Sequence, residues 1–432
     1  MWQDLGMKNT HTKQNVRDEF FAPVASALQR SEFSYKCPKY TDRLYLESGV
    51  GRSIKNVISG REWIQHVLMK LGIKITVSNS FAVFKSSRRL NFLSGIAKDV
   101  RTQADKLISQ GGDPLSQYSE LSGFAIYASD GHTHKASAHE QEIYGKKRPV
   151  THIYSLNLRM QTLIPLVLAE PGANRKKEHE LTALKRIGVQ ALRMGEKTGT
   201  KVIHVYDPAI VDYTQWYKWK KGSGVYILTL EKSNSALITV GINDWDRDDT
   251  RNIGVICDEL VGPSNGHIMR RVTYQDPLTG KTFRFITNEL TIPPGLIAFL
   301  YKLRWNVEKT FDEIKNKFFE RKAWGNSNGA KIQQANFIAL AYNLMRILET
   351  KLKRDEGIID HAVAAKRKKR LKKEKEETIV AGRRANALVL AWHRSSQRSL
   401  QFIRWLRYCI ENSTSWGPAI KLLRPLMAEY LH

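Results

Sequence analysis

Residues 124–131 read FAIYASDG, a short apolar run that ends at an Asp-Gly pair. Two further apolar segments follow it, THIYSLNLRMQ at 151–161 and TLIPLVLA at 162–169. Segments of this length that are rich in aliphatic and aromatic residues and bounded by turn residues are typical of β-strands joined as hairpins. The sequence therefore predicts three successive strands, and we expect the first of them to end at Asp130.

The next segments alternate between helical and strand patterns. Residues 177–194 carry apolar residues at helical spacing, and KVIHVY at 201–206 has the composition of a buried strand that ends at Asp207. A second helix is expected over 212–220 and a further strand over 225–230. The order β-β-β-α-β-α-β is that of a ribonuclease H-like fold. The predicted class is therefore α/β, with a mixed sheet and helices on its faces.

The charge of the chain indicates a polyanionic partner. Its 432 residues include 69 Lys and Arg but only 42 Asp and Glu, which gives a formal net charge of +27. Such self-repulsion disfavours a compact chain unless a polyanion offsets it, and nucleic acid is the default partner. The alternative is a basic protein whose Lys-rich faces are merely solvated.

Other classes of protein are disfavoured by features that the sequence lacks. No apolar run approaches the ~20 residues that a membrane-spanning helix needs, and residues 1–21 contain no apolar signal-peptide segment. No Gly-rich phosphate loop occurs, so we expect no nucleotide cofactor. Three widely spaced cysteines exclude a disulfide scaffold and fit a reducing compartment. We therefore expect a cytoplasmic protein with no membrane partner.

The segment with the most chemical information is the helix expected over Leu296 to Lys322. At about 100° per residue, its residues Tyr301, Arg304, Glu308 and Lys315 share one arc of about 60°. Apolar residues form the adjacent stripe, which is expected to pack on the sheet. The remaining face is expected to be solvated and holds Lys302, Asn306, Lys309, Thr310, Glu313 and Lys317.

Two interpretations of this polar arc stay open from the residues alone. A carboxylate flanked by two cations can hold a divalent metal while the cations bind phosphate oxygens. An ordinary amphipathic helix would instead use Arg304 and Glu308 as an i,i+4 ion pair. Trp305 beside the arc could stack on an unpaired base, or it could be part of the core.

The spacing Tyr301-x2-Arg304-x3-Glu308-x6-Lys315 matches, without a gap, the Tyr-Arg-Glu-Lys (YREK) motif of a family of bacterial insertion-sequence DDE transposases. Over about residues 120 to 350 the chain thus resembles transposases of the insertion-sequence family four type. The resemblance implies binding to double-stranded DNA, both transposon ends and target. It also implies a homodimer in the DNA complex and a bacterial, nucleoid-associated location.

The resemblance also implies three catalytic carboxylates. They are Asp130 in the first core strand, Asp207 after the fourth strand, and Glu308 on the helix that follows a β insertion. Two departures from the family pattern occur beside them. Asp207-Pro208-Ala209 replaces the usual Asp-Arg-Gly, and Asp130-Gly131-His132 replaces an Asp-Gly-Thr or Asp-Ser-Thr sequence. Neither departure removes a carboxylate.

The chemistry that the resemblance implies is phosphoryl transfer. Asp130, Asp207 and Glu308 would ligate Mg²⁺ or Mn²⁺, with two ions expected, because oxygen-only ligands suit these metals. Water would cleave the DNA at the transposon end, and the freed 3′-hydroxyl would then attack the target. Arg304, Lys315 and Tyr301 would hold DNA near the cleaved bond, and Trp305 is a further expected DNA contact.

Composition and resemblance together predict five regions along the chain. They are 1–118, helical and expected to bind the DNA ends; 119–230, the first part of the ribonuclease H-like core; 231–292, a β-rich insertion; 293–349, the second part of the core with the YREK helix; and 350–432, a basic helical region. The last region is expected to contribute to the dimer through Phe402, Trp405, Leu406 and Ile410. The alternative is that these residues pack inside their own chain.

Two other functions stay open. The chain could be a ribonuclease H-like nuclease acting on another nucleic acid, although the complete motif and the β insertion favour a transposase. It could also be a DNA-binding regulator derived from a transposase whose catalytic activity is lost, although all three carboxylates are present.

Overall fold

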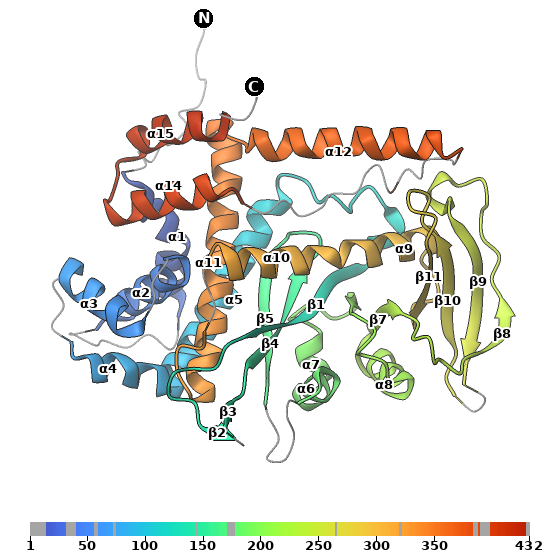
Figure 1. Ribbon diagram of the computed structural model, residues 1–432, viewed down its shortest axis with the longest axis horizontal. Coiled ribbons are helices and arrows are strands. Elements are labelled where there is room, and N and C mark those ends of the chain that lie inside the picture. The colour runs from blue at the N-terminus through green and yellow to red at the C-terminus, as the bar shows by residue number, and fades with distance from the viewer. Residues whose placement is uncertain are drawn as a thin grey trace, which may run out of the picture.

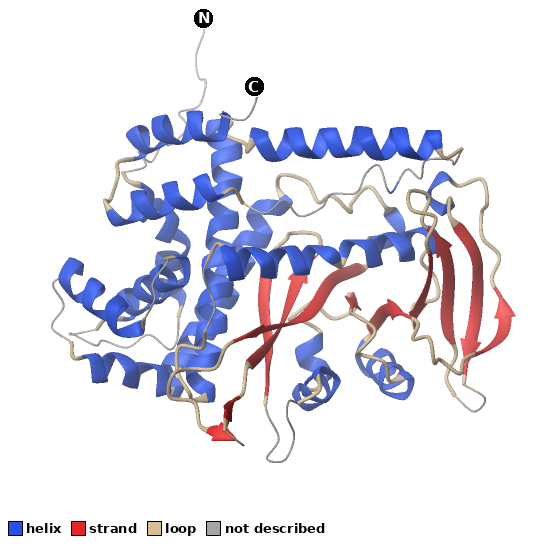
Figure 2. Cartoon of the chain, in the orientation of Figure 1, coloured by secondary structure: helices blue, strands red, loops and turns tan. Residues whose placement is uncertain are grey.

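The computed structural model describes residues 14–31, 40–55, 59–71, 75–143, 145–170, 178–263, 266–318, 322–382, 388 and 398–428. Within them, one nine-stranded sheet runs across the molecule with helices on both faces, so the predicted α/β class is confirmed (Figures 1 and 2). The sheet order is β5-β4-β1-β6-β7-β11-β10-β9-β8. Its strands are β1 (Phe124–His134), β4 (Val150–Asn157), β5 (Leu163–Ala169), β6 (Lys201–Val205), β7 (Val225–Leu230), β8 (Ile238–Ile242), β9 (Val255–Gly262), β10 (Met269–Gln275) and β11 (Thr282–Thr287).

The sheet is mixed because its centre is parallel and its two sides are antiparallel. β6 pairs in parallel with β1 and with β7, whereas β4 and β5 on one side and β8 to β11 on the other pair antiparallel. The strands of residues 231–292 thus continue the same sheet through the pairing of β11 with β7. A separate small hairpin consists of β2 (Glu142–Ile143) and β3 (Lys146–Lys147).

Each face of the sheet is covered by its own set of helices (Figure 1). On one face lie α5 (Ser87–Ser109), α9 (Pro294–Leu303), α10 (Trp305–Asn316) and α11 (Asn328–Glu356), packed on alternate residues of β1 such as Ile126 and Ala128. On the other face lie α6 (Glu180–Ile187), α7 (Val189–Leu192) and α8 (Tyr213–Ser223), packed on Tyr127 and its neighbours. Successive side chains of β1 therefore point to opposite faces of the sheet and belong to two separate hydrophobic cores.

The remaining helices come from the two ends of the chain, and the first two of them pack on α11. They are α1 (Val16–Arg30), α2 (Asp42–Ile54), α3 (Gly60–Leu71), α4 (Val77–Ala82), α12 (His361–Val380), α14 (Leu400–Glu411) and α15 (Trp416–Ala428). α2 ends at Ile54 and α3 begins at Gly60. None of the described helices is long and apolar enough to cross a membrane.

The prediction of one continuous helix from Leu296 to Lys322 is wrong. A turn at Arg304 separates α9 from α10, and α10 ends at Asn316. At the turn the Arg304 N–H donates to the Tyr301 carbonyl (3.1 Å) and the Val307 N–H donates to the Arg304 carbonyl (3.0 Å). Because these are i→i−3 bonds, the backbone tightens without reversing, and the two helices follow each other over the sheet (Figure 1).

The face of α10 that was expected to be solvated is partly buried. Asn306, Thr310 and Glu313 are 2–3% exposed. The Glu313 carboxylate pairs with the guanidinium of Arg398 and accepts the Arg398 backbone N–H at 3.0 Å. The Nε of Arg398 also lies 3.1 Å from Glu349 on α11. The C-terminal part of the chain therefore covers this face of α10, which helix periodicity alone cannot indicate.

The apolar residues predicted to contribute to a dimer pack inside the chain. Phe402, Trp405 and Leu406 on α14 are at most 4% exposed, and Ile410 is packed against the same core. The Trp405 ring N–H donates to the Ala419 carbonyl of α15 at 2.9 Å. This face of α14 is therefore core, and a dimer contact through it is ruled out in this conformation. The basic run at residues 366–375 forms part of α12.

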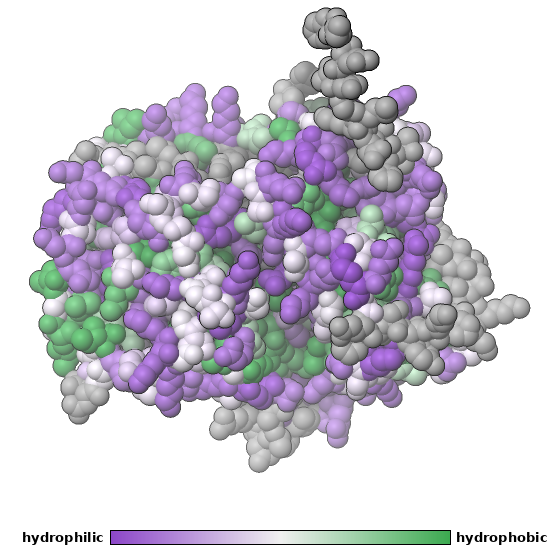
Figure 3. All heavy atoms as spheres, turned by 180° about the vertical axis from the view of Figure 1, so that it is seen from behind, coloured by the Kyte–Doolittle hydropathy of each residue, from purple (hydrophilic) through white to green (hydrophobic). Residues whose placement is uncertain are grey.

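An exposed apolar patch lies at the end of the sheet opposite β5, on the edge strand β8 and its neighbour β9. Ile238, Val240 and Ile242 alternate along β8 and are 57–75% exposed, and Ile256 on β9 is 52% exposed. Figure 3 shows hydrophobic residues gathered at this end of the molecule, on its left side as drawn.

The buried pair Glu313–Arg398 gives a stability prediction. Glu313→Ala should lower the free energy of unfolding by about 3 kcal/mol, because it leaves a buried guanidinium with only Glu349 to offset its charge. Urea denaturation followed by tryptophan fluorescence measures the effect. The matched control is Asp312→Ala, which removes the preceding carboxylate on the exposed side of α10. Equal stability of the two variants would contradict this role of the pair.

Candidate active site

The register between β1 and β6 brings Asp130 and Asp207 to the same edge of the sheet. The last parallel pair joins Ala128 to Val205, and each aspartate follows its member of that pair by two residues. Parallel neighbours end at the same edge, so the spacing alone places both carboxylates there. The prediction that β1 ends at Asp130 is wrong, because β1 continues to His134 in antiparallel pairing with β4.

Asp130 is largely buried and its pKa is raised. The Gly131 backbone N–H donates to its Oδ1 at 2.8 Å. Burial is the main cause that raises the pKa of Asp130 to about 6, and the negative charges of Glu180 and Asp207 raise it further. The Gly131 hydrogen bond and the positive charge of Arg304 act in the opposite direction. Carboxylates are therefore crowded at this edge of the sheet.

Asp207 lies in the turn that follows β6. Its Oδ1 accepts the backbone N–H of Ala209 at 2.9 Å, so the side chain closes an Asx-type turn over Pro208. Proline fits at this place because it has no N–H to donate and the hydrogen bond comes from the next residue. The departure Asp207-Pro208-Ala209 thus makes a local turn that orients the Asp207 carboxylate.

Arg304 connects the edge of the sheet to α10. Its Nη2 donates to Glu308 Oε1 at 2.6 Å, and its Nη1 lies 3.7 Å from Asp130 Oδ2. The Arg304 side chain is 11% exposed and the Glu308 side chain is 33% exposed. One guanidinium therefore faces two carboxylates that are 178 positions apart in sequence, counted as 308 − 130. The arrangement goes beyond a surface i,i+4 pair, because Asp130 is a second partner on a different element.

Tyr301 lies between Arg304 and the sheet. Its ring packs against Phe285 of β11 with centroids 5.0 Å apart, and the Arg304 guanidinium carbon lies 5.6 Å from the ring centroid of Tyr301. Burial is the largest cause that raises the pKa of the Tyr301 hydroxyl, with smaller contributions from the charges of Asp207 and Glu308. Its hydroxyl is therefore a neutral donor near two of the carboxylates.

The two other predicted DNA contacts lie outside this group. Trp305 is 45% exposed in the first turn of α10, so the interpretation of Trp305 as a core residue is wrong. Lys315 is exposed in the last turn of α10. The sequence motif thus spans a buried part, Tyr301 and Arg304, and an exposed part, Trp305 and Lys315, with Glu308 between them.

The donor type of this site fits a hard divalent cation, because the carboxylates of Asp130, Asp207 and Glu308 provide only oxygen. The crowding that raises the pKa of Asp130 is also what a bound cation would relieve. In the present arrangement, no three His, Cys, Asp or Glu side chains of the described residues are close enough together to hold one ion. The guanidinium of Arg304 instead partly neutralises Asp130 and Glu308.

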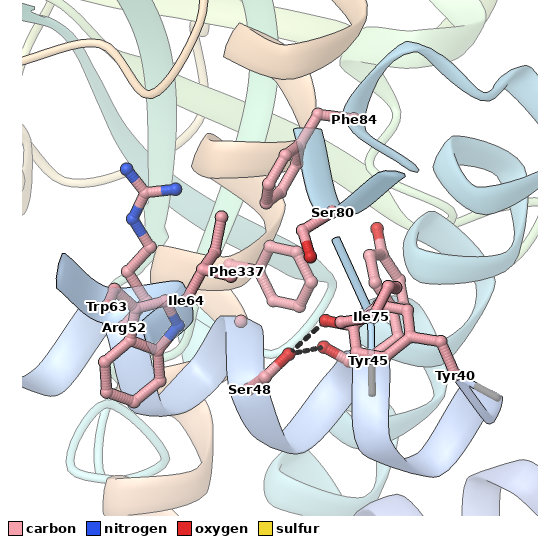
Figure 4. Close-up of a pocket in the computed structure, with 11 residues that line it drawn as sticks. Tyr40, Tyr45, Ser48, Arg52, Trp63, Ile64, Ile75, Ser80, Phe84 and Phe337 are labelled. Atoms are coloured by element: carbon pink, nitrogen blue, oxygen red, sulfur yellow. Dashed lines mark hydrogen bonds between the residues drawn. The ribbon is translucent and has the colours of Figure 1, made fainter. Parts of the chain in front are cut away.

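Two hollows lie away from the carboxylates. A cavity of about 30 Å³ between α2, α4 and α11 is lined by aromatic residues, and there the Tyr40 and Ser48 hydroxyls share a 2.6 Å hydrogen bond (Figure 4). It has room for about one water molecule. A larger groove of about 680 Å³ follows β5, between α5 and α11 on one side and α6 on the other. Neither is lined by Asp130, Asp207 or Glu308.

Sequence reasoning missed Glu180, whose charge acts on Asp130. It lies in the first turn of α6 and was not singled out, because an acidic residue at a helix start usually stabilises the helix dipole. The local sequence feature that relates to the position of Glu180 is Gly131, which has no side chain. A Cβ atom built there would lie 2.4 Å from Glu180 Oε1.

Comparison with known proteins identifies the family. No curated protein matches the chain. The family model described as transposase DDE domain matches residues 103–344, which is more than half of the chain and includes Asp130, Asp207, Tyr301, Arg304 and Glu308. The chain therefore belongs to the transposase DDE domain family.

Proposed function

We propose that the protein is an insertion-sequence transposase that binds the terminal inverted repeats of its element, cleaves DNA at their ends and joins the 3′-hydroxyl ends to target DNA. The observation that carries the proposal is that Arg304 faces both Asp130 and Glu308, with Asp207 at the same edge of the sheet, within the part of the chain that the family model matches. The YREK spacing on α9 and α10 supports a finer part of the proposal, that the protein is of the insertion-sequence family four type. Its core is then ribonuclease H-like.

The strand order supports the ribonuclease H-like part of this proposal. Three antiparallel strands, β5, β4 and β1, are followed by the parallel strands β6 and β7, with α6 to α8 on one face. β8 to β11 then extend the sheet, and α9 returns the chain over it toward β1. In this proposal the regions keep the boundaries 1–118, 119–230, 231–292, 293–349 and 350–432.

Asp130, Asp207 and Glu308 would hold Mg²⁺ or Mn²⁺. Such an ion, when bound, activates the attacking oxygen and stabilises the oxygen that leaves phosphorus. The protein itself supplies the rigid placement of these carboxylates. Asp130 is fixed by strand register, Asp207 by a hydrogen-bonded turn and Glu308 by a helix, so none depends on a long flexible loop.

Arg304 is suited to act on a DNA phosphate. Its guanidinium has several N–H donors in a planar fork that can clamp two phosphate oxygens at once. It pairs with Glu308 and Asp130, and in this proposal the phosphate and the cation would meet at this place. Tyr301 supports the guanidinium through ring contact.

The exposed residues of α10 would hold the DNA further from the reacting bond. Trp305 presents an aromatic surface on which a base can stack, and Lys315 is a point charge for the backbone two to three turns further on. The net charge of +27 provides the long-range attraction for DNA. We retain a homodimer as part of the proposal, without assigning the apolar face of α14 to it.

Conservative variants of the three carboxylates test the reaction. Asp130→Asn, Asp207→Asn and Glu308→Gln should each reduce Mg²⁺-dependent cleavage of DNA carrying the element ends by at least about 1,000-fold, because each removes a negative ligand. Binding of the ends in a gel-shift assay should stay within about three-fold, because phosphate contacts set affinity. Glu376→Gln, at an exposed carboxylate of α12 outside the site, is the control and should cleave normally. Cleavage at the wild-type rate by any of the three variants would remove that residue from the site.

Substitution of Arg304 by lysine, which keeps the positive charge, separates a phosphate-binding role from a purely structural one. Arg304→Lys should lower the cleavage rate by at least about ten-fold, because an ammonium cannot clamp two oxygens and small misplacements are costly. The midpoint of thermal unfolding should change by less than about 3 °C, since a cation still faces Glu308 and Asp130. Normal cleavage by Arg304→Lys would mean that any cation suffices there.

Lys315→Ala should instead weaken binding of the DNA ends and leave the cleavage rate of bound DNA nearly unchanged.

The raised pKa of Asp130 predicts how stability depends on pH without metal. The unfolded carboxyl ionises near pH 3.8 but the folded one near 6, so between these values the folded state binds more protons and loses stability as pH rises. In EDTA at pH 7.5, Asp130→Asn should therefore raise the free energy of unfolding by up to about 3 kcal/mol. The gain should vanish below about pH 3, where Asp130 of the wild type is protonated in both the folded and the unfolded state. Urea denaturation that gives equal gains at about pH 3 and at pH 7.5 would contradict this origin.

A further inference from the structure

Glu180 reaches the carboxylate site from the opposite face of the sheet. It begins α6, on the side away from α10 (Figure 1). A Cβ atom on Gly131 would lie 2.4 Å from Glu180 Oε1 and 2.9 Å from its carboxylate carbon. Such contacts are far inside van der Waals distance, so the carboxylate occupies space that only a glycine at 131 leaves open. Gly131 directly follows Asp130.

The sheet is open at this point. β6 pairs with β1 only as far as Ala128, and beyond it β1 pairs with β4 on its other side. Among the described residues, the open side of β1 has no further backbone pairing before an isolated bridge between Lys135 and Lys322. Side chains from the two faces can therefore meet there, Asp130 from the α10 side and Glu180 from the α6 side.

The geometry around Gly131 places Glu180 beside the strand end that carries Asp130. The Cβ position of Gly131 that faces the Glu180 carboxylate also lies 3.2 Å from Thr151 Cγ2 on β4. A fourth carboxylate thus lies next to the residue that follows Asp130, on the α6 side of this edge.

We propose that Glu180 is a fourth carboxylate of this site, which raises its affinity for the divalent cation. The inference rests on the proposed function, because the cation is the one assigned there to Asp130, Asp207 and Glu308. Stabilisation of the α6 dipole accounts for an acidic residue at this position. It does not account for a carboxylate packed against Gly131 beside Asp130.

Two substitutions remove the carboxylate from this place by different routes. Glu180→Gln removes the charge, whereas Gly131→Ala keeps Glu180 at the helix start and displaces its carboxylate with a methyl group. The Gly131 N–H that binds Asp130 is retained in the alanine variant. A role limited to the helix dipole would respond only to Glu180→Gln, so Gly131→Ala separates the two explanations.

The measurement is the dissociation constant of Ca²⁺ and of Mn²⁺ for the full chain by isothermal calorimetry, so no cleavage is needed. Glu180→Gln and Gly131→Ala should each weaken binding by about ten-fold, at the lower end of the effect of lost outer-shell partners. The double variant should be no weaker than either single variant, because both remove the same group. Glu376→Gln, an exposed carboxylate on α12, is the control and should bind normally.

Asp130→Asn separates this inference from the proposed function. If Asp130→Asn loses cation binding but both Glu180→Gln and Gly131→Ala bind as the wild type does, only the role of Glu180 is overturned. If Asp130→Asn also binds normally, or the wild type binds neither cation, the proposed metal site fails and the inference with it. Circular dichroism and thermal unfolding verify that each variant is folded. If Gly131→Ala is unfolded, Glu180→Asp, which shortens the reach of the carboxylate, replaces it and should also weaken binding.

Discussion

Repulsion among carboxylates at one edge of the sheet is the constraint around which the site is arranged. The parallel register of β1 with β6 places Asp130 and Asp207 at the same edge, and α10 brings Glu308 to it. Burial makes this crowding costly, since it weakens the solvation of each charge. The response within the chain is Arg304, whose guanidinium faces both Asp130 and Glu308. Its position at the turn between α9 and α10 lets it reach the strand and the helix together.

The parts of the site that follow from local geometry could be predicted from the sequence. The order of strands and helices fixes which strands are parallel neighbours, and that relation is enough to bring Asp130 and Asp207 together. The spacing of Tyr301, Arg304 and Glu308 places them on one side of a helix, and the turn at Arg304 does not change this, because it tightens the backbone without reversing it. A prediction that depends on neighbouring residues therefore survives an error in the extent of the helix.

The parts that depend on long-range packing could not be predicted. Glu313 appears solvated on a helical wheel, yet it is buried because Arg398, 85 positions later, covers it. The apolar face of α14 has the pattern of an interface, yet α15 and the core already cover it. Amphipathic periodicity indicates that one face of a helix is buried, but it does not indicate which part of the protein covers that face. Glu180 was missed for a related reason, because its place depends on the absence of a side chain at Gly131 and not on the presence of a motif.

The net charge of the chain is positive, whereas the candidate site is rich in carboxylates, and the two charges act on a DNA phosphate in opposite directions. In the proposed function, a net charge of +27 would attract the DNA backbone from a distance, but the phosphate to be cleaved would have to approach a cluster of carboxylates. At contact distance the local repulsion exceeds the diffuse attraction, because solvent and salt screen the distant charges more strongly. A phosphate can therefore enter only when local cations offset the carboxylates. Arg304 provides one such cation, and its existing contacts with Asp130 and Glu308 mean that it cannot bind phosphate fully without leaving those carboxylates uncompensated. A divalent cation that takes over the carboxylates would release Arg304 for the phosphate, so we expect DNA to engage this edge most tightly when the metal is present.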